Sequence, residues 1–213
     1  WTIRATARSG HSSGVCKPDV GCGAIYELTR ILDEFRRELP EPNLTYNVGL
    51  ILGGASAALN ADDTGGAATG KPNVIASDAM ARGDIRTLSP EQETRVRGRM
   101  RAIVARHLDR AGAEIEFSDD GYPPMAPTEG NRALLAQLNA VNTTLGLPQM
   151  PAGDPANRGA GDISFVAFID GLVGLGMAGE GSHAPGETAD LKSLDVQAKR
   201  AALLISRLAK TPR

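Results

Sequence analysis

One histidine near the C-terminal end of the chain lies in a setting that suits metal binding. His183 is part of the run Gly-Glu-Gly-Ser-His-Ala-Pro-Gly-Glu at residues 179–187. A neutral imidazole is a common ligand of transition metals, and the neighbouring glycines let a loop aim it into a site. Glu187 is close enough in sequence to support a ligated histidine through its carboxylate. The alternative is that His183 is a loop histidine hydrogen-bonded to a carbonyl. A single histidine does not distinguish this interpretation from a metal ligand.

The two cysteines do not extend this candidate metal site. Cys16 and Cys22 are six residues apart, which is neither the spacing of a redox CxxC motif nor a convincing half of a zinc site. We interpret both as ordinary thiols. The chain begins at Trp1, within a run where apolar and polar residues alternate as in a strand. Because a protein seldom begins inside a strand, we expect further residues before Trp1. A targeting segment would lie there as well, and the sequence therefore indicates no compartment.

The composition is that of a globular protein and argues against two classes of partner. Hydrophobic residues make up 41% of the chain and the formal charge is only −2. These values exclude a disordered acidic tail and give no electrostatic reason to bind nucleic acid or anionic lipid. The longest mostly apolar run, residues 165–178, contains Asp170 and several glycines and is too short to cross a bilayer. We expect neither nucleic acid nor a membrane as a partner.

The first part of the chain alternates between strand and helix patterns. Apolar and polar residues alternate at 1–7 and again at 44–52, which predicts two strands. Between them, apolar residues recur at steps of three and four, which predicts an amphipathic helix that ends at Pro40. The apolar stripe of this helix consists of Ile25, Leu28, Leu32, Phe35 and Leu39.

The same order of elements then continues. Residues 55–71 are rich in Ala, Gly, Asp and Thr, which indicates a long excursion or hairpin tip before a strand at about 73–86. The run Ser-Pro-Glu-Gln at 89–92 has the pattern of a capping box and begins a second helix. A last strand is expected at 114–117. The order βαββαβ predicts a ferredoxin-like α+β unit over residues 1–119, with a four-stranded antiparallel sheet and two helices on one face.

The composition changes after Asp119, where prolines form a stiff connector into a second region at 120–213. The expected elements of this region are helices at 129–145 and 194–208, a short helix from Asp162 and an apolar strand at 173–177. A parallel strand needs neighbours on both sides. The region therefore predicts an incomplete α/β domain.

Six short pieces of the chain, in this order, carry a resemblance to a known family. They are Gly10-His11-Ser12-Ser13-Gly14, Gly53-Gly54, Asn73-Val74-Ile75, Gly83-Asp84-Ile85-Arg86, Gly159-Ala160-Gly161-Asp162 and Gly181-Ser182-His183 with Glu187. The chain resembles the C-terminal part of the co-catalytic zinc peptidase family that includes glutamate carboxypeptidase, aminoacylase and succinyl-diaminopimelate desuccinylase. These pieces extend over nearly the whole chain.

The resemblance implies an architecture and an activity. In that family a βαββαβ lid, which is also the dimerisation domain, is inserted into a zinc-binding α/β domain. The enzymes hydrolyse amide bonds next to a free carboxylate, as in N-acyl amino acids or small peptides. Two zinc ions per site are implied, with cobalt or manganese as other candidates, and the protein is expected to form a homodimer through the lid. Most metal ligands would precede Trp1, so we expect the 213 residues alone to be inactive.

The resemblance also implies roles for individual residues. His183 corresponds to the late zinc ligand, and His11 to a lid histidine that stabilises the oxyanion in the partner subunit's active site. Asn73 and Arg86 correspond to lid residues that hold the substrate's carboxylate. An imidazole N–H can donate to a developing oxyanion, and the guanidinium fork can grip a carboxylate with two hydrogen bonds.

Each role has an alternative. His11 could be a surface residue at a strand end, and Asn73 a turn residue before its strand. Arg86 could pair with Asp84 or Glu91 at the end of its strand. For the whole chain, the alternative to an amidohydrolase is a non-enzymatic dimerisation or binding module.

Overall fold

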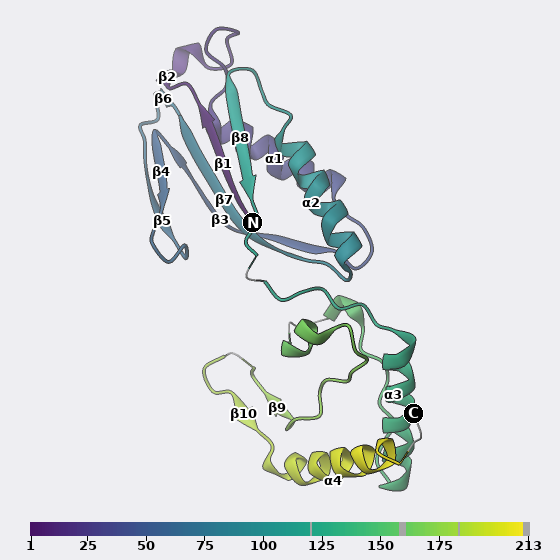
Figure 1. The fold of residues 1–213 in the computed structure, drawn as a ribbon. Helices are drawn as coiled ribbons and strands as arrows, with labels where there is room; N and C mark the ends of the chain where they lie inside the picture. The colour runs from purple at the N-terminus through teal and green to yellow at the C-terminus, as the bar shows by residue number, and fades with distance from the viewer. Residues whose placement is uncertain (120, 158–160, 183, 211–213) are drawn as a thin grey trace. The chain divides into compact units, whose positions relative to one another are not determined.

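A computed structural model describes residues 1–119, 121–157, 161–182 and 184–210. The chain divides into two compact units, Trp1–Pro124 and Met125–Arg213. Each unit has its own buried cluster of apolar side chains, and the two are described in turn (Figure 1).

The first unit has the predicted βαββαβ order. Its main elements are β1 (Thr2–Ala7), α1 (Ala24–Glu38), β3 (Thr45–Gly54), β7 (Asp78–Arg86), α2 (Pro90–Val104) and β8 (Ala111–Glu116). The four strands form one sheet in the order β3-β7-β1-β8, with every neighbouring pair antiparallel. Both helices cover the same face of the sheet (Figure 1). This arrangement confirms the ferredoxin-like prediction for the first part of the chain.

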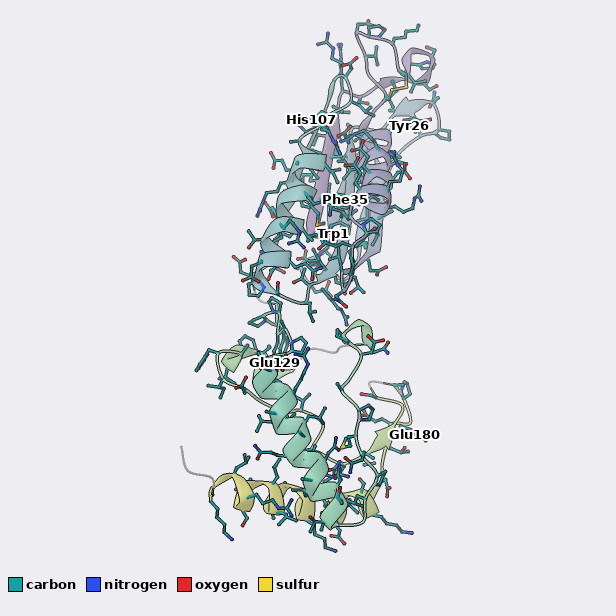
Figure 2. The ribbon with its side chains drawn as sticks, turned by 90° about the vertical axis from the view of Figure 1, so that its right-hand side faces the viewer. Trp1, Tyr26, Phe35, His107, Glu129 and Glu180 are labelled. Carbon is teal, nitrogen blue, oxygen red and sulfur yellow. A yellow bond between two sulfur atoms is a disulfide. The ribbon has the colours of Figure 1, made fainter. Side chains whose placement is uncertain are left out.

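The core of this unit lies between the sheet and the two helices. Trp1 and Phe35 meet edge to face, with ring centroids 5.9 Å apart (Figure 2). The N-cap of α2 forms as expected, because the Ser89 hydroxyl accepts the Gln92 amide hydrogen at 3.2 Å. Gln92 in turn accepts the Leu88 amide hydrogen at 2.7 Å, so the capping box closes on the residue before the cap.

Helix α1 buries the predicted stripe except at its first member, Ile25. Ile25 is 45% exposed, whereas the intervening Glu27 is fully buried. Leu28 and Phe35 are buried as predicted. The predicted period was therefore correct, and the buried face also includes Glu27.

Strand β3 contains a bulge, so the alternation predicted over residues 44–52 does not continue along the whole strand. The register with β7 shifts between Val48 and Leu50, which leaves Gly49 unpaired. Tyr46 packs on the helix-covered core, but Leu50 and Leu52 pair with Arg82 and Met80 on the opposite face. A register change of one residue moves every following side chain to the other face of a sheet.

The excursion at 55–71 forms a β-hairpin. Its strands are β4 (Ser56–Leu59) and β5 (Gly66–Thr69), paired in antiparallel register. The hairpin reaches the face that the helices leave open: Gly66 lies against the Leu52 side chain, and Asp63 near its tip pairs with Arg82 at 3.5 Å. It therefore shields part of the open face beside β3 and β7.

The buried carboxylate of Glu27 ties α1 to the segment after α2. It accepts hydrogen bonds from Arg30 at 2.6 Å and from the Leu108 amide at 2.9 Å, and His107 lies 3.6 Å away. Burial alone would raise the pKa of Glu27, but the hydrogen bonds and charge of Arg30 and the Leu108 amide more than offset it. The pKa is therefore lowered from the 4.5 of a free glutamate.

The lowered pKa of Glu27 predicts a pH-dependent stability. A carboxyl group with a depressed folded-state pKa stabilises the fold fully above about pH 4.5 and loses that contribution as the pH falls through the folded-state value. We expect Glu27→Gln to lower the free energy of unfolding by about 1–3 kcal/mol at pH 7. Urea unfolding between pH 7 and pH 3 should show this difference shrinking on acidification. The exposed Glu116→Gln is the control, and a difference that is constant with pH would contradict the assignment.

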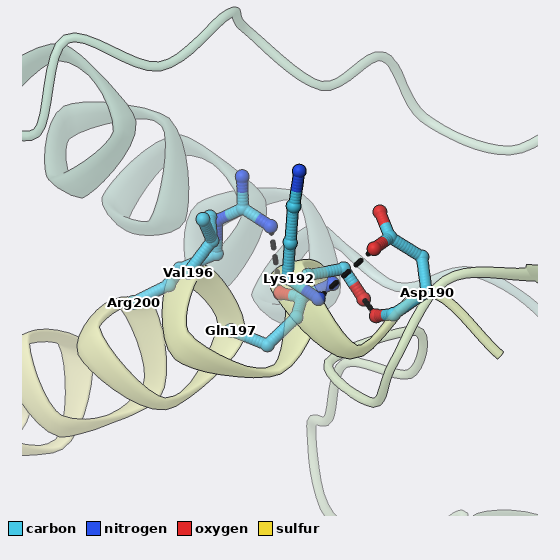
Figure 3. Close-up of a pocket in the computed structure, with 6 residues that line it drawn as sticks. Asp190, Lys192, Val196, Gln197 and Arg200 are labelled. Atoms are coloured by element: carbon cyan, nitrogen blue, oxygen red, sulfur yellow. Dashed lines mark hydrogen bonds between the residues drawn. The ribbon is translucent and has the colours of Figure 1, made fainter.

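The second unit is built around two helices. Helix α3 (Glu129–Thr144) packs on α4 (Leu191–Leu208), and Leu138, Val141 and Leu204 are buried between them. The Arg200 guanidinium donates to Asn142 at 2.7 Å in the same contact. A shallow hollow of about 310 Å³ opens at the start of α4, where Lys192 and Arg200 extend to the same side (Figure 3).

The predicted strand at 173–177 is not formed. The described residues of this unit contain only one strand pair, β9 (Gly179–Glu180) with β10 (Thr188–Ala189), so residues 173–177 have no strand beside which to pair. Large apolar side chains are exposed in this unit, namely Phe165, Val166, Phe168, Ile169, Val173, Met177, Leu191, Leu194 and Ile205. Across the described parts of the chain, every helix is too short or too polar to span a bilayer.

Candidate active-site residues

Two of the predicted lid residues lie beside one another. His11 ends the short strand β2 (Gly10–His11), which pairs with β6 (Val74–Ile75) in the register His11↔Val74. The Ser12 amide donates to the Asn73 carbonyl at 3.0 Å. These backbone bonds hold His11 and Asn73 together. The strands β2 and β6 lie at one end of the four-stranded sheet (Figure 1). Both residues are exposed, as residues that act on an external substrate must be.

The imidazole of His11 is oriented by the turn that follows it. Its Nδ1 accepts the Ser13 amide hydrogen at 3.2 Å and lies 2.9 Å from the Ser13 hydroxyl. These two contacts make His11 the N-cap of a short 3-10 helix, η1 (Ser12–Gly14). Sequence patterns assigned no role to Ser13, because the amide that donates to His11 is common to every residue except proline.

The loop after this turn is closed by a disulfide, which corrects our interpretation of the cysteines as ordinary thiols. Cys16 and Cys22 are bonded, with Cα atoms 4.1 Å apart. The Cys16 amide also donates to the Gly21 carbonyl at 2.9 Å. Spacing alone could not reveal the bond, because a tight turn brings the two ends of this loop together.

Arg86 lies at the other end of the sheet. It is the last residue of β7, and β7 begins five residues after Asn73. A strand rises about 3.3 Å per residue, so the two ends of β7 are roughly 26 Å apart. One lid therefore cannot hold a single carboxylate with both Asn73 and Arg86.

The alternative partner considered for Arg86 is present. Its Nε donates to Asp84 at 3.0 Å, and both side chains are about half exposed. Exposed ion pairs of this kind contribute only about 0–1 kcal/mol. A substrate carboxylate can compete with Asp84 for the same guanidinium.

The predicted metal-binding position lies in the second unit. His183 itself lies outside the described residues. Among its described neighbours in sequence, Glu180 pairs with Thr188, and the exposed Glu187 donates its amide hydrogen to the Ala184 carbonyl at 3.1 Å. In the parts of the chain that the structure covers, no three His, Cys, Asp or Glu side chains gather in a way that could hold a metal ion. These residues do not by themselves make a metal site, and the roles of His183 and Glu187 stay predictions.

Comparison with known proteins identifies the family. The family model of the peptidase dimerisation domain matches residues 1–112. The chain belongs to this family. The match spans the βαββαβ unit up to β8 and includes His11, Asn73 and Arg86. No curated protein matched the sequence.

Solved structures with the same fold include several hydrolases. A tripeptidase from Staphylococcus aureus has 18% identity and a TM-score of 0.64, and the match covers 99% of this chain and 51% of that one. A putative aminohydrolase from methicillin-resistant Staphylococcus aureus has 16% identity and a TM-score of 0.66, covering 96% and 49%. A dinuclear metal-binding peptidase of the M20 family from Bacillus subtilis has 19% identity and a TM-score of 0.60, covering 99% and 49%. The chain spans about half the length of these proteins.

Proposed function

We propose that the chain is part of a metal-dependent amidohydrolase or peptidase that cleaves an amide bond next to a free carboxylate. Residues 1–119 are its lid and dimerisation domain, and residues 120–213 are the C-terminal part of its catalytic domain. The substrates are N-acyl amino acids or small peptides. Two zinc ions, or cobalt or manganese, would supply the activated water, with His183 as one ligand and Glu187 supporting it. Family membership and the folds of the similar hydrolases support this proposal.

The observation that carries the proposal is the division of the lid residues between the two ends of one sheet. His11 and Asn73 share one end, and Arg86 lies at the other. A single copy cannot bring the three side chains to one substrate, but two copies can. Each active site of a homodimer therefore uses Arg86 from its own subunit and His11 with Asn73 from the partner.

A free sheet edge with apolar residues supports association of two lids. β3 is an edge strand of the four-stranded sheet. Ile51 on this strand is 57% exposed, and Ile25 of α1, which lies against Gly53, is 45% exposed. An edge strand can pair with a second copy, and exposed apolar side chains favour that contact. A homodimer through β3 and α1 would bury both features.

His11, Asn73 and Arg86 have different roles in the proposed reaction. The His11 Nε2–H donates to the carbonyl oxygen as negative charge develops during attack by water, and Asn73 lies next to it for a further hydrogen bond. The Arg86 guanidinium holds the free carboxylate of the substrate by two parallel hydrogen bonds, which places the scissile amide.

We expect Arg86→Ala in the complete protein to raise KM about 10- to 100-fold for substrates with a free carboxylate, because a charge-assisted hydrogen bond contributes about 1.5–3 kcal/mol. The methyl ester of the same N-acyl amino acid should show almost no change. Initial rates with both substrates, with and without a chelator, measure this. Arg36→Ala is the matched control, because Arg36 is an exposed α1 arginine that also pairs with an aspartate.

Two outcomes would contradict the proposal. An equal effect of Arg86→Ala on acid and ester would exclude carboxylate binding by Arg86. A complete protein that forms dimers but hydrolyses no amide with any of the three metals would instead support a non-enzymatic dimerisation or binding module.

A further inference from the structure

We propose that Ser13 is a positioning residue that places the ring proton of His11 on Nε2. Ser13 touches no substrate in this proposal and acts only through the imidazole. The placement of the proton follows from the hydrogen bonds alone, whereas its value for catalysis rests on the function proposed above.

The hydrogen bonds of Nδ1 decide which ring nitrogen carries the proton. A backbone amide can only donate, so the Ser13 N–H at 3.2 Å requires a lone pair on Nδ1. A neutral imidazole has one proton, which must then be on Nε2. The Ser13 hydroxyl at 2.9 Å can rotate to donate to Nδ1 as well. With the proton on Nδ1 the hydroxyl could accept it, but the amide would face a second donor and lose its hydrogen bond.

The backbone around Ser13 keeps both donors in place. The Ser12 amide is bonded to Asn73, and the Val15 amide donates to the Ser12 carbonyl at 3.1 Å, which closes the turn. His11 is held from the other side by its pairing with Val74. Ser13 therefore presents its amide and hydroxyl to the ring as fixed features of the fold.

This arrangement leaves the Nε2–H of the His11 ring available to donate to a substrate. Within the parts of the chain that the structure covers, the hydrogen bonds of the His11 ring involve Nδ1 only, and the side chain is exposed. A ring with Nε2–H is ready to donate to an oxyanion without first moving a proton. The other tautomer would present a lone pair to the oxyanion and repel it.

Nitrogen-15 NMR of the 213-residue chain tests the placement of the proton without any enzymatic activity. The ring nitrogens of His11, assigned by comparison with His11→Gln, are recorded at a pH where the imidazole is neutral. We expect the wild type to carry its proton on Nε2. Ser13→Ala removes a hydroxyl that can pair with either tautomer but keeps the backbone amide, so this variant should keep the proton on Nε2.

Two further variants sharpen the test. Ser13→Pro lacks the backbone N–H, a donor worth about 0.5–1.5 kcal/mol, so the ratio of the two tautomers should shift about 2- to 10-fold toward Nδ1–H. Ser12→Ala keeps the Ser13 amide and should leave the ratio unchanged. A wild-type ring protonated on Nδ1, or a tautomer ratio that Ser13→Pro does not alter, would overturn the proposal.

Kinetics of the complete protein then distinguish the placement of the ring proton by Ser13 from the proposed role of His11 as oxyanion donor. We expect Ser13→Pro to lower kcat in proportion to the fraction of rings that still carry the proton on Nε2, with KM unchanged, and Ser12→Ala to leave kcat unchanged. If the tautomer shifts while kcat stays the same, the structural role of Ser13 stands. In that case His11 is not the oxyanion donor, and that step of the proposed function fails.

Discussion

His11→Ala in the complete protein is expected to lower kcat about 10²- to 10³-fold, with KM almost unchanged. In the proposed function, the Nε2–H of His11 donates to the carbonyl oxygen as that oxygen gains negative charge, so its loss affects the transition state and not substrate binding. Steady-state kinetics on an N-acyl amino acid measure the effect. His107→Gln is the control, because His107 lies near Glu27 in the first unit and not beside Asn73. A change in KM alone would contradict an oxyanion role.

The same variant tests whether His11 serves the partner subunit. An His11→Ala subunit keeps its own metal-binding residues, and an His183→Ala subunit keeps its own His11. A heterodimer of the two contains one complete active site, formed from both subunits. Random reassociation of equal amounts should recover about a quarter of the wild-type activity, because half of the dimers are mixed and each has one working site. Recovery absent from verified heterodimers would show that His11 acts within its own subunit.

Gly83→Ala is expected to destabilise the first unit by about 3 kcal/mol or more. Gly83 lies in β7, where its amide donates to the Trp1 carbonyl at 3.1 Å and its carbonyl accepts from the Trp1 nitrogen at 2.9 Å. A Cβ atom there would collide with the Asn47 carbonyl oxygen and with the Trp1 indole ring. Since one obstacle is backbone, a change of side-chain rotamer cannot relieve it. Urea unfolding monitored by the fluorescence of Trp1 measures the loss.

Gly98→Ala is the matched control for this prediction. Gly98 lies on the exposed side of α2, and an added Cβ would meet nothing within 4 Å. Alanine is the better helix former, so this variant should be more stable than the wild type by about 0.5–1 kcal/mol. Equal stability of Gly83→Ala and the wild type would mean that β7 and Trp1 do not pack as described.

The helices of the first unit could be predicted because their signals are local. The step of three and four in α1 and the serine cap before α2 both act within one or two turns of helix, so residues a few positions apart carry the information. The order of strands and helices followed from the same local patterns. The fold class was then limited to the few arrangements in which two helices cover one face of such a sheet.

Features that depend on distant neighbours could not be predicted in this way. The bulge at Gly49 sends Leu50 and Leu52 to the open face, where Leu52 lies against Gly66 of the hairpin. Glu27 is buried because Arg30 and the Leu108 amide satisfy its carboxylate. Leu108 is 81 residues away in sequence, which no local pattern registers. The disulfide between Cys16 and Cys22 likewise depends on how the loop turns.

The amino-acid sequence by itself determined the βαββαβ order, the family resemblance and the identity of the candidate site residues. Only the tertiary structure decided which of them lie together. Strand pairing places His11 beside Asn73 although 62 positions separate them in the sequence, and β7 carries Arg86 to the far end although it is only 13 positions from Asn73. The physical reason is that an extended strand moves the chain about 3.3 Å per residue, whereas an antiparallel pair brings remote residues within hydrogen-bond distance.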